Sequence, residues 1–275
     1  MSAFHHDAAI KTKILAELDA GTVPDNDASA ETLSVWADGA GLPPALVLLA
    51  TYLTRGEDES GQRFLRTLLE PAEPGANLIP VAHSWVVWAW ENAPAPLCVA
   101  SDDPRYRDAG EAMVSLHRRV AAGDTVESGV WRSVRGALNR LANGNDVMAD
   151  AASVLAAGSW DFATVPGAAH DMANAWDKAE MSRINREQNW TDADRGRIQE
   201  IIIEQRGIAE ERLGKDAERS ALTTAMVAQL DTLNDPHLFR NRDVRDLVLA
   251  AFEQLRKASS AALIELVHAT TQVEA

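Results

Sequence analysis

The most constraining feature of this 275-residue chain is a segment, residues 78–90, that is apolar on every side. It holds three tryptophans, Trp85, Trp88 and Trp90. Pro80 suits the first turn of a helix, because that turn does not use the N–H that proline lacks. A helix that is apolar all round is usually buried in the middle of a fold. Each buried indole also contributes a large apolar area, so we expect the rest of the chain to pack around this segment.

The remainder of the chain has the periodicity of helices. Apolar residues recur at helical spacing, and alternating strand patterns are essentially absent. The sequence is 46% hydrophobic but only 5% aromatic, which is typical of alanine- and leucine-rich helices rather than of β-sandwich strands. Two polar pairs, Asp124 with Glu127 and Thr191 with Asp194, resemble helix-capping signals. We therefore predict an all-α fold, a multi-helix bundle.

The C-terminal third differs in character from the rest. Two long, charged, periodic stretches, residues 195–233 and 244–266, flank a proline-containing turn. This arrangement predicts a long antiparallel helical hairpin, in which Gly207 and Gly214 weaken the first helix and could kink or split it. We accordingly expect a bundle at residues 1–190, built around the tryptophan helix at 78–92, and a hairpin at residues 191–275 that could pack on this bundle.

Charge and cysteine content exclude several classes of function. The formal net charge of −15 argues against nonspecific binding to nucleic acid or to an anionic membrane. The single cysteine, Cys98, excludes an internal disulfide and a multi-cysteine zinc site, and it fits a reducing compartment. We find no signal-peptide pattern and no apolar stretch long enough to span a bilayer. We therefore expect a cytoplasmic protein.

No arrangement of residues predicts catalysis, a cofactor or a metal. The His-Glu-x-x-His zinc pattern, the glycine-rich phosphate loop and the Gly-x-Ser-x-Gly elbow are all absent. His83 and His170 fall on apolar helices, where a histidine is more often a hydrogen-bonded core residue than a ligand. His117 precedes two arginines and is expected at a solvated helix end. Adjacent Asp102 and Asp103 are interpreted as a helix cap rather than an acid–base pair.

Acidic residues gather on one part of the predicted long helix. Four glutamates fall opposite its isoleucines and could form a surface for a basic partner: Glu200, Glu204, Glu210 and Glu211. The plainer interpretation is a solvated helix face. We take these four as the candidate partner-binding residues.

Arginines are concentrated in one third of this otherwise acidic chain. They are Arg105, Arg107, Arg118, Arg119, Arg132, Arg135 and Arg140. On paired helices, four of them could line an anion-binding groove: Arg118, Arg119, Arg132 and Arg135. The plainer interpretation is a set of surface ion pairs, which specify little. Trp131 and Trp160 could stack a base, although their helical spacing favours core positions.

Several short motifs lie between about residues 4 and 180. They are Phe4-His-His-Asp7 with Ile10-Lys11, Gly41-Leu-Pro43, Pro74-Gly-Ala-Asn-Leu78, and Leu116-His-Arg-Arg119 followed by Gly123 and Trp131. These motifs resemble a group of uncharacterised bacterial and phage proteins with alanine-rich helices, some of which are described as candidate immunity proteins. That group usually carries a Gly-Cys-x-x-Gly-Cys segment after its first helix, which this chain lacks. The resemblance implies an intracellular partner-binding role and no reaction.

Together these features lead to one main hypothesis about function. We expect a non-catalytic cytoplasmic protein, such as an immunity or inhibitor protein, that binds a protein with a basic surface through its acidic helices. The predicted hairpin would be available for self-association. One alternative is a phage-type DNA mimic whose carboxylate rows occupy the groove of a nucleic-acid-binding defence enzyme. Another is a small-molecule-binding helical enzyme with a pocket near His83, Trp85 and the arginines.

Overall fold

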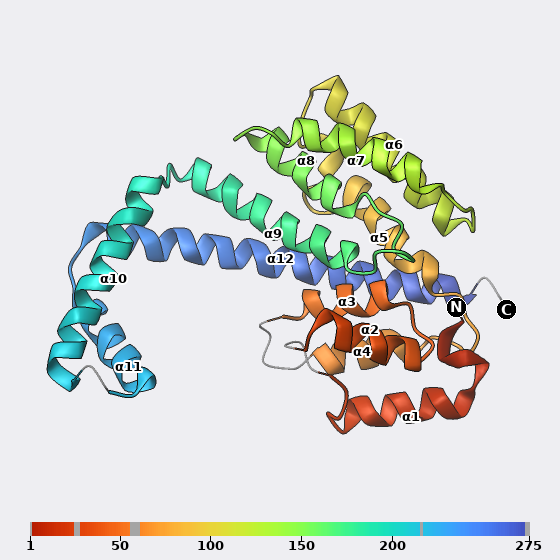
Figure 1. The fold of residues 1–275 in the computed structure, drawn as a ribbon, viewed down its shortest axis with the longest axis horizontal. Coiled ribbons are helices and arrows are strands. Elements are labelled where there is room, and N and C mark those ends of the chain that lie inside the picture. Colours follow the sequence, from red (N-terminus) through yellow and green to blue (C-terminus); the bar gives the residue numbers. More distant parts are fainter. Residues whose placement is uncertain (1, 25–27, 56–60, 215–216, 273–275) are drawn as a thin grey trace. The chain divides into compact units, whose positions relative to one another are not determined.

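The computed structural model describes residues 2–24, 28–55, 61–214 and 217–272, and every regular element within these ranges is helical (Figure 1). In chain order they are η1 (Ala3–His6), α1 (Ala8–Asp19), α2 (Ala30–Gly39), α3 (Pro44–Leu53), α4 (Gly61–Leu69), α5 (Ile79–Glu91), η2 (Leu97–Val99), α6 (Pro104–Ala121), α7 (Ser128–Leu141), α8 (Val147–Gly158), α9 (Ala168–Glu187), α10 (Asp192–Leu213), α11 (Arg219–Leu230) and α12 (Pro236–Gln272). The predicted all-α fold is confirmed. None of the described helices is both long and apolar enough to cross a membrane.

The chain divides into two compact units. Unit 1 comprises Met1–Ala179 and Glu253–Ala275, and unit 2 comprises Glu180–Phe252. This division differs from the boundary expected between residues 190 and 191, since the end of α12 belongs with the N-terminal part. The reason is burial: Leu255, Leu263 and Val267 of α12 are part of the main hydrophobic core of unit 1.

Unit 1 is assembled around α5, as the apolar character of that segment predicts. Within it, α1 to α4 pack as one group and α5 to α8 as another, and α3 packs against α5 (Figure 1). Trp85 and Trp90 are fully buried, while Trp88 is half-buried. The rings of Trp85 and Trp88 each lie within 6.4 Å of the Trp176 ring, centroid to centroid. Aromatic contacts of this kind add to the free energy gained from burying the rings.

One close approach between α5 and α6 depends on glycine. A Cβ atom added at Gly110 would overlap the ring of Trp90, which is 1% exposed and cannot move aside. Glycine-to-alanine changes inside helices usually stabilise by about 0.5–1 kcal/mol. We expect Gly110→Ala instead to lower the free energy of unfolding by about 1–3 kcal/mol, because overpacking costs that much.

A matched variant separates the overlap from helix propensity. Gly207 lies inside α10 with no atom within 4 Å of an added Cβ, so Gly207→Ala should show the ordinary stabilising sign. Urea denaturation of the full chain, followed by circular dichroism, measures both changes. A gain in stability for Gly110→Ala as large as that for Gly207→Ala would contradict the overlap.

Unit 2 includes α10, α11 and the first part of α12. The stretch over residues 195–233, where two glycines predict a kink or a split, is two helices, α10 and α11, which pack on each other. They separate at Gly214, whose φ of +91° is a conformation that favours glycine. A small core that includes Ile198, Ile201 and Val248 joins α10 to the part of α12 that belongs to unit 2.

Candidate functional site

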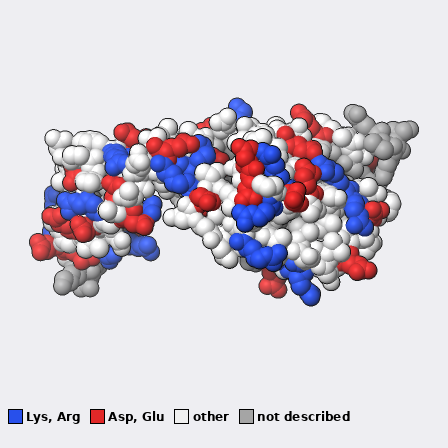
Figure 2. Space-filling model, turned by 90° about the horizontal axis from the view of Figure 1, so that it is seen from above, with Lys and Arg blue, Asp and Glu red and all other residues white. Residues whose placement is uncertain are grey.

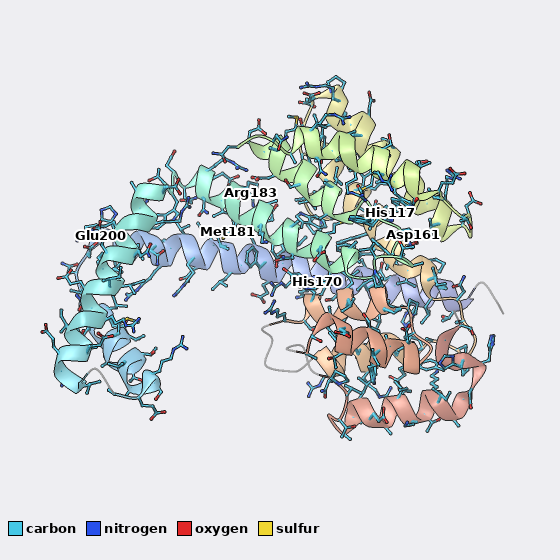
Figure 3. All side chains as sticks on the ribbon, in the orientation of Figure 1. His117, Asp161, His170, Met181, Arg183 and Glu200 are labelled. Carbon is cyan, nitrogen blue, oxygen red and sulfur yellow. The ribbon has the colours of Figure 1, made fainter. Side chains whose placement is uncertain are left out.

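The four predicted glutamates all lie on α10, but only three share a face. At about 100° per residue, Glu200, Glu204 and Glu211 fall within about 40° of one another. All three are exposed, on the side of α10 away from its buried stripe (Figure 3 labels Glu200). Glu210 is half-buried and ion-paired to Arg206 at 2.8 Å. Glu200, Glu204 and Glu211 therefore form one exposed acidic face, and Glu210 is not part of it.

The same face of α10 carries an exposed isoleucine that the charge pattern does not single out. Ile203 is 63% exposed and lies one helical turn from both Glu200 and Gly207. No atom lies within 4 Å of a Cβ added at Gly207, so the helix backbone is open to close approach there. We call Glu200, Ile203, Glu204, Gly207 and Glu211 the α10 face.

Ile203 is part of a wider property of unit 2. Among the described residues thirteen large apolar side chains are exposed, and nine of them lie in unit 2: Met181, Ile202, Ile203, Ile208, Leu213, Val227, Phe239, Leu247 and Leu249. The four in unit 1 are all valines. In α11 no residue is buried. Unit 2 thus leaves much more large apolar surface in water than unit 1 does.

A groove between α10 and α11 includes part of this apolar surface. It has a volume of about 590 Å³ and is lined by apolar side chains that include Ile202, Leu222 and Met226. Arg206 and Arg219 also line it, so its charge is opposite to that of the α10 face. The two surfaces lie on different sides of α10 and would suit different partners.

Charge on the molecule is mixed rather than arranged in rows. Unit 2 has fourteen acidic and eleven basic residues, so the acidic excess of the chain belongs mainly to unit 1. On the face drawn in Figure 2, acidic and basic side chains are interspersed. Glu200 itself is ion-paired to Arg197 at 3.2 Å. Local pairs of this kind reduce the long-range attraction of the acidic surface.

The four predicted groove arginines separate into two pairs. Arg118 forms ion pairs with Glu91 and Glu111. Arg119 pairs with Asp124 at 3.4 Å. These two therefore follow the plainer interpretation of surface ion pairs. Arg132 and Arg135, in contrast, line one pocket of unit 1.

That pocket, which we call the α7 pocket, has a volume of about 230 Å³ and is also lined by Trp131 and Trp160. The guanidinium carbon of Arg135 lies 3.4 Å from the ring centroid of Trp160. Arg135 also donates to the carbonyl oxygen of Ser159 at 3.0 Å. Burial and the neighbouring charge of Arg132 lower the pKa of Arg135. Within the described part of the chain, neither arginine has a carboxylate partner.

The N-terminal turn of α7 opens onto the same pocket. The expected capping box of Asp124 and Glu127 is wrong, because Glu127 is the N-cap residue but its side chain accepts no bond, and Asp124 turns to Arg119 instead. Among the described residues, no side chain accepts from the first N–H groups of α7, of which that of Val130 donates to the carbonyl oxygen of Glu127 at 3.0 Å. Ser128 of this turn and Thr164 line the pocket. The Thr191–Asp194 capping box, by comparison, is present on α10.

Behind the α7 pocket lies a buried pair of histidines. His83 and His117 are 1% and 0% exposed, and their Nδ1 atoms are 2.9 Å apart. The His117 ring contacts Trp131, with centroids 4.9 Å apart, and the His83 ring stacks on Phe162. The core role predicted for His83 is confirmed. The solvated position expected for His117, which Figure 3 labels, is wrong.

The hydrogen bonds of this pair fix which nitrogens carry protons. The Nε2 atom of His117 lies 3.1 Å from the carbonyl oxygen of Gly158, which can only accept. His117 therefore carries its proton on Nε2 and accepts through Nδ1 from His83. That leaves a lone pair on Nε2 of His83, a buried atom that no donor reaches among the described residues. Burial lowers the pKa of His83 to about 4, an effect that the nearby Asp161 carboxylate partly offsets.

A second polar network in unit 1 joins three helices. The hydroxyl of Tyr52 on α3 donates to Oδ2 of Asp177 on α9 at 2.7 Å. Arg256 on α12 donates to the same oxygen at 2.6 Å. Burial and the Asp177 carboxylate raise the pKa of Tyr52 above its ordinary range, which keeps its hydroxyl protonated.

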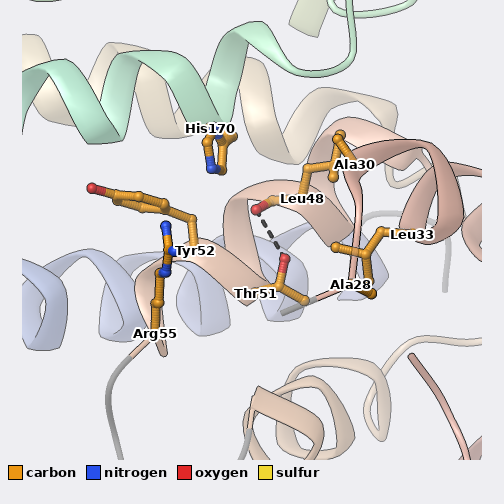
Figure 4. Close-up of a pocket in the computed structure, with 8 residues that line it drawn as sticks. All are labelled: Ala28, Ala30, Leu33, Leu48, Thr51, Tyr52, Arg55 and His170. Carbon is orange, nitrogen blue, oxygen red and sulfur yellow. Dashed lines mark hydrogen bonds between the residues drawn. The ribbon is translucent and has the colours of Figure 1, made fainter. Parts of the chain in front are cut away.

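A small pocket of about 170 Å³ lies beside this network, lined in part by Tyr52, Arg55 and His170 (Figure 4). The ring of His170 meets the ring of Tyr52 edge-on, at a centroid distance of 4.7 Å. His170 is only half-buried and contacts the carboxylate of Asp171 at 3.2 Å.

No family model, curated protein or solved structure matches this chain. The resemblance to immunity-type proteins therefore stays a prediction. Among the described residues, no group of three or more histidine, cysteine, aspartate or glutamate side chains is placed to hold a metal ion. The α10 face, the α7 pocket and the buried networks are the features of the molecule that bear on function.

Proposed function

We propose that this protein is a non-catalytic protein-binding protein that engages its partner through the α10 face. The observation that carries the proposal is the position of Ile203, which is 63% exposed at one edge of a face that also bears Glu200, Glu204 and Glu211. Because Ile203 is 63% exposed, most of its side chain gains no burial within its own chain. Gly207, one turn away, lets a partner approach the helix backbone.

The composition of the face defines the chemistry of the partner. Full burial of an isoleucine side chain is worth about 1.5–3 kcal/mol, enough for an anchor. Carboxylates beside such an anchor speed association with a basic surface and disfavour acidic ones. We infer a partner protein with an apolar depression flanked by lysine or arginine. An inhibitor or immunity protein belongs to this class.

The experiment is capture of the partner from the native host by the tagged full-length protein, read by mass spectrometry and followed by affinity measurement with the purified pair. Ile203→Ser should weaken binding by at least about tenfold, because the anchor is lost. The triple change of Glu200, Glu204 and Glu211 to glutamine should slow association, most strongly at low salt.

Two controls separate binding by the α10 face from an effect of net charge and from binding by the groove. A second triple variant, with Glu31, Glu73 and Glu265 of unit 1 changed to glutamine, alters net charge equally at positions outside unit 2. It should leave binding nearly unchanged. Met226→Ser alters the α10–α11 groove instead. Loss of binding with Met226→Ser, together with full binding by Ile203→Ser, would move the interface to the groove and overturn the proposal.

A further inference from the structure

The α7 pocket has the components of an anion site. Arg132 and Arg135 line it one helical turn apart, and the whole of α7 contains three arginines and no acidic residue. In a chain of net charge −15, carboxylates are plentiful, yet within the described residues none forms an ion pair with either arginine. Two guanidinium groups line the cavity with a single carboxylate, that of Asp161, so the pocket keeps a net positive charge that attracts an anion from solution.

Several neutral donors converge on the same place. The first turn of α7 has N–H groups without a side-chain cap, and helix N-termini of this kind favour phosphate. Trp131 lines the pocket and is 3% exposed, and its indole N–H has no acceptor among the described residues. A buried donor without an acceptor costs about 1–3 kcal/mol, and Trp131 therefore gives the wall of the pocket an unsatisfied polar group.

We propose that the α7 pocket binds a small phosphate monoester. A phosphate group has enough oxygens to accept from Arg132, Arg135 and the N-terminal turn of α7 together, whereas a carboxylate has only two. The volume of about 230 Å³ is below the range of pockets that hold drug-sized ligands, so the organic part is small. This function is separate from the α10 face, which lies in unit 2.

The arginines have different parts in this site. Arg135 is already held by the Trp160 ring and by the carbonyl oxygen of Ser159, so it loses little freedom when a ligand binds. Arg132 is exposed and has no such restraint. Arg135 therefore positions the phosphate, and the exposed side chain of Arg132 becomes ordered when it binds the phosphate.

Asp161 sets the identity of the organic part. Its carboxylate also lines the pocket, where its Oδ1 accepts from the backbone N–H of Ala163 at 3.0 Å. This charge disfavours a bare inorganic phosphate, but it can accept a hydrogen bond from a ligand hydroxyl. The geometry therefore favours a hydroxyl-bearing phosphate monoester over the free ion.

The test uses the full-length protein with three probes: glycerol 3-phosphate, inorganic phosphate and glycerate. The tryptophan indole N–H signals are followed by ¹H–¹⁵N NMR, and the Trp131 signal is assigned with a Trp131→Phe variant. We expect a saturable shift of that signal, strongest with glycerol 3-phosphate. Arg132→Gln should weaken this binding by at least about tenfold, since it removes a charge-assisted hydrogen bond.

Arg140→Gln is the matched control, because Arg140 is an exposed arginine of the same helix that does not line the pocket. It should leave the affinity unchanged, and unchanged indole signals in the ligand-free Arg132→Gln protein would show that this variant is folded. Three results would overturn the proposal: no saturable Trp131 shift, an equal loss of affinity in Arg132→Gln and Arg140→Gln, or tighter binding of glycerate than of glycerol 3-phosphate.

Discussion

Replacing Asp177 by alanine should lower the free energy of unfolding by about 3–5 kcal/mol. Asp177 is 5% exposed, and one of its oxygens accepts from both Tyr52 and Arg256. Without that carboxylate, the charge of Arg256 stays in a site where only 21% of its side chain is exposed. The buried Tyr52 hydroxyl would keep only the weak contact to Asn174 at 3.4 Å. The variant therefore removes the acceptor that Tyr52 and Arg256 share, although Arg256 still donates to the carbonyl oxygen of Arg55 at 2.7 Å.

A paired replacement shows whether charge or packing is responsible. Changing Asp177 to leucine and Arg256 to methionine together removes both charges, and apolar substitutes for a buried ion pair are often close to neutral. We expect the double variant to be more stable than Asp177→Ala. Urea denaturation monitored by tryptophan fluorescence reports on this part of the chain, because seven of the eight tryptophans lie in unit 1.

The outcome that would contradict this prediction is equally specific. If the free energy of unfolding of Asp177→Ala differed from that of the original protein by less than about 0.5 kcal/mol, the change would behave as an ordinary surface substitution. Water would then be able to replace the Asp177 carboxylate as the hydrogen-bond acceptor of Tyr52 and Arg256. The network would lose its role in joining α3, α9 and α12.

The sequence is sufficient to predict what depends on local periodicity. The burial of Trp85 and Trp90 follows from a helix that is apolar on every side, and the all-α fold follows from spacing repeated along the chain. These features can be read from a few neighbouring residues. The same holds for Thr191 and Asp194, whose capping box is a local pattern.

What the sequence does not predict depends on residues distant along the chain. Tyr52 and Arg256 are about two hundred positions apart, and no spacing rule indicates that both bind Asp177. The expected position of His117 is wrong because the two arginines that follow it suggest a solvated helix end. Its place four residues after the buried Met113, on the apolar stripe of α6, is the signal that indicates burial.

Composition and charge indicate some features of the C-terminal third and miss others. The change in composition near residue 191 suggests a domain boundary, and one unit boundary lies between Ala179 and Glu180, but no pattern indicates that residues 253–275 belong to unit 1. The glutamates of α10 stand out because charge is easy to see in a sequence. Ile203 does not stand out, since a hydrophobic residue in a periodic helix is ordinarily assigned to the core.

Acidification should destabilise unit 1 through the His83–His117 pair. Burial lowers the pKa of His83 from 6.5 to about 4, and burial together with the proximity of His83 lowers the pKa of His117 well below 6.5. Both rings are therefore neutral in the folded protein between these values, whereas both become protonated in the unfolded chain. The unfolded state then binds more protons, so stability falls as the pH falls below 6.5.

The hydrogen bonds explain why the folded pair resists protonation. A second proton on His117 would have to sit on Nδ1, facing the N–H of His83 at 2.9 Å. A second proton on His83 would sit on Nε2, where no described group accepts it. Between pH 7 and pH 5 each histidine should then cost about 2 kcal/mol of stability, or about 4 kcal/mol for the pair.

The measurement is the free energy of unfolding at pH 7 and at pH 5, taken from urea denaturation by tryptophan fluorescence. Changing both His83 and His117 to methionine removes the two titrating groups, so the difference between the two pH values should shrink by about 4 kcal/mol. His268→Gln, at an exposed position of α12 in unit 1, should leave that difference unchanged. An acid sensitivity equal in the double variant and the original protein would mean that the pair is already protonated when folded, and that carboxylates alone cause the loss. The comparison uses only the difference in free energy of unfolding between pH 7 and pH 5. It therefore remains valid even if the methionine variant is less stable at both pH values.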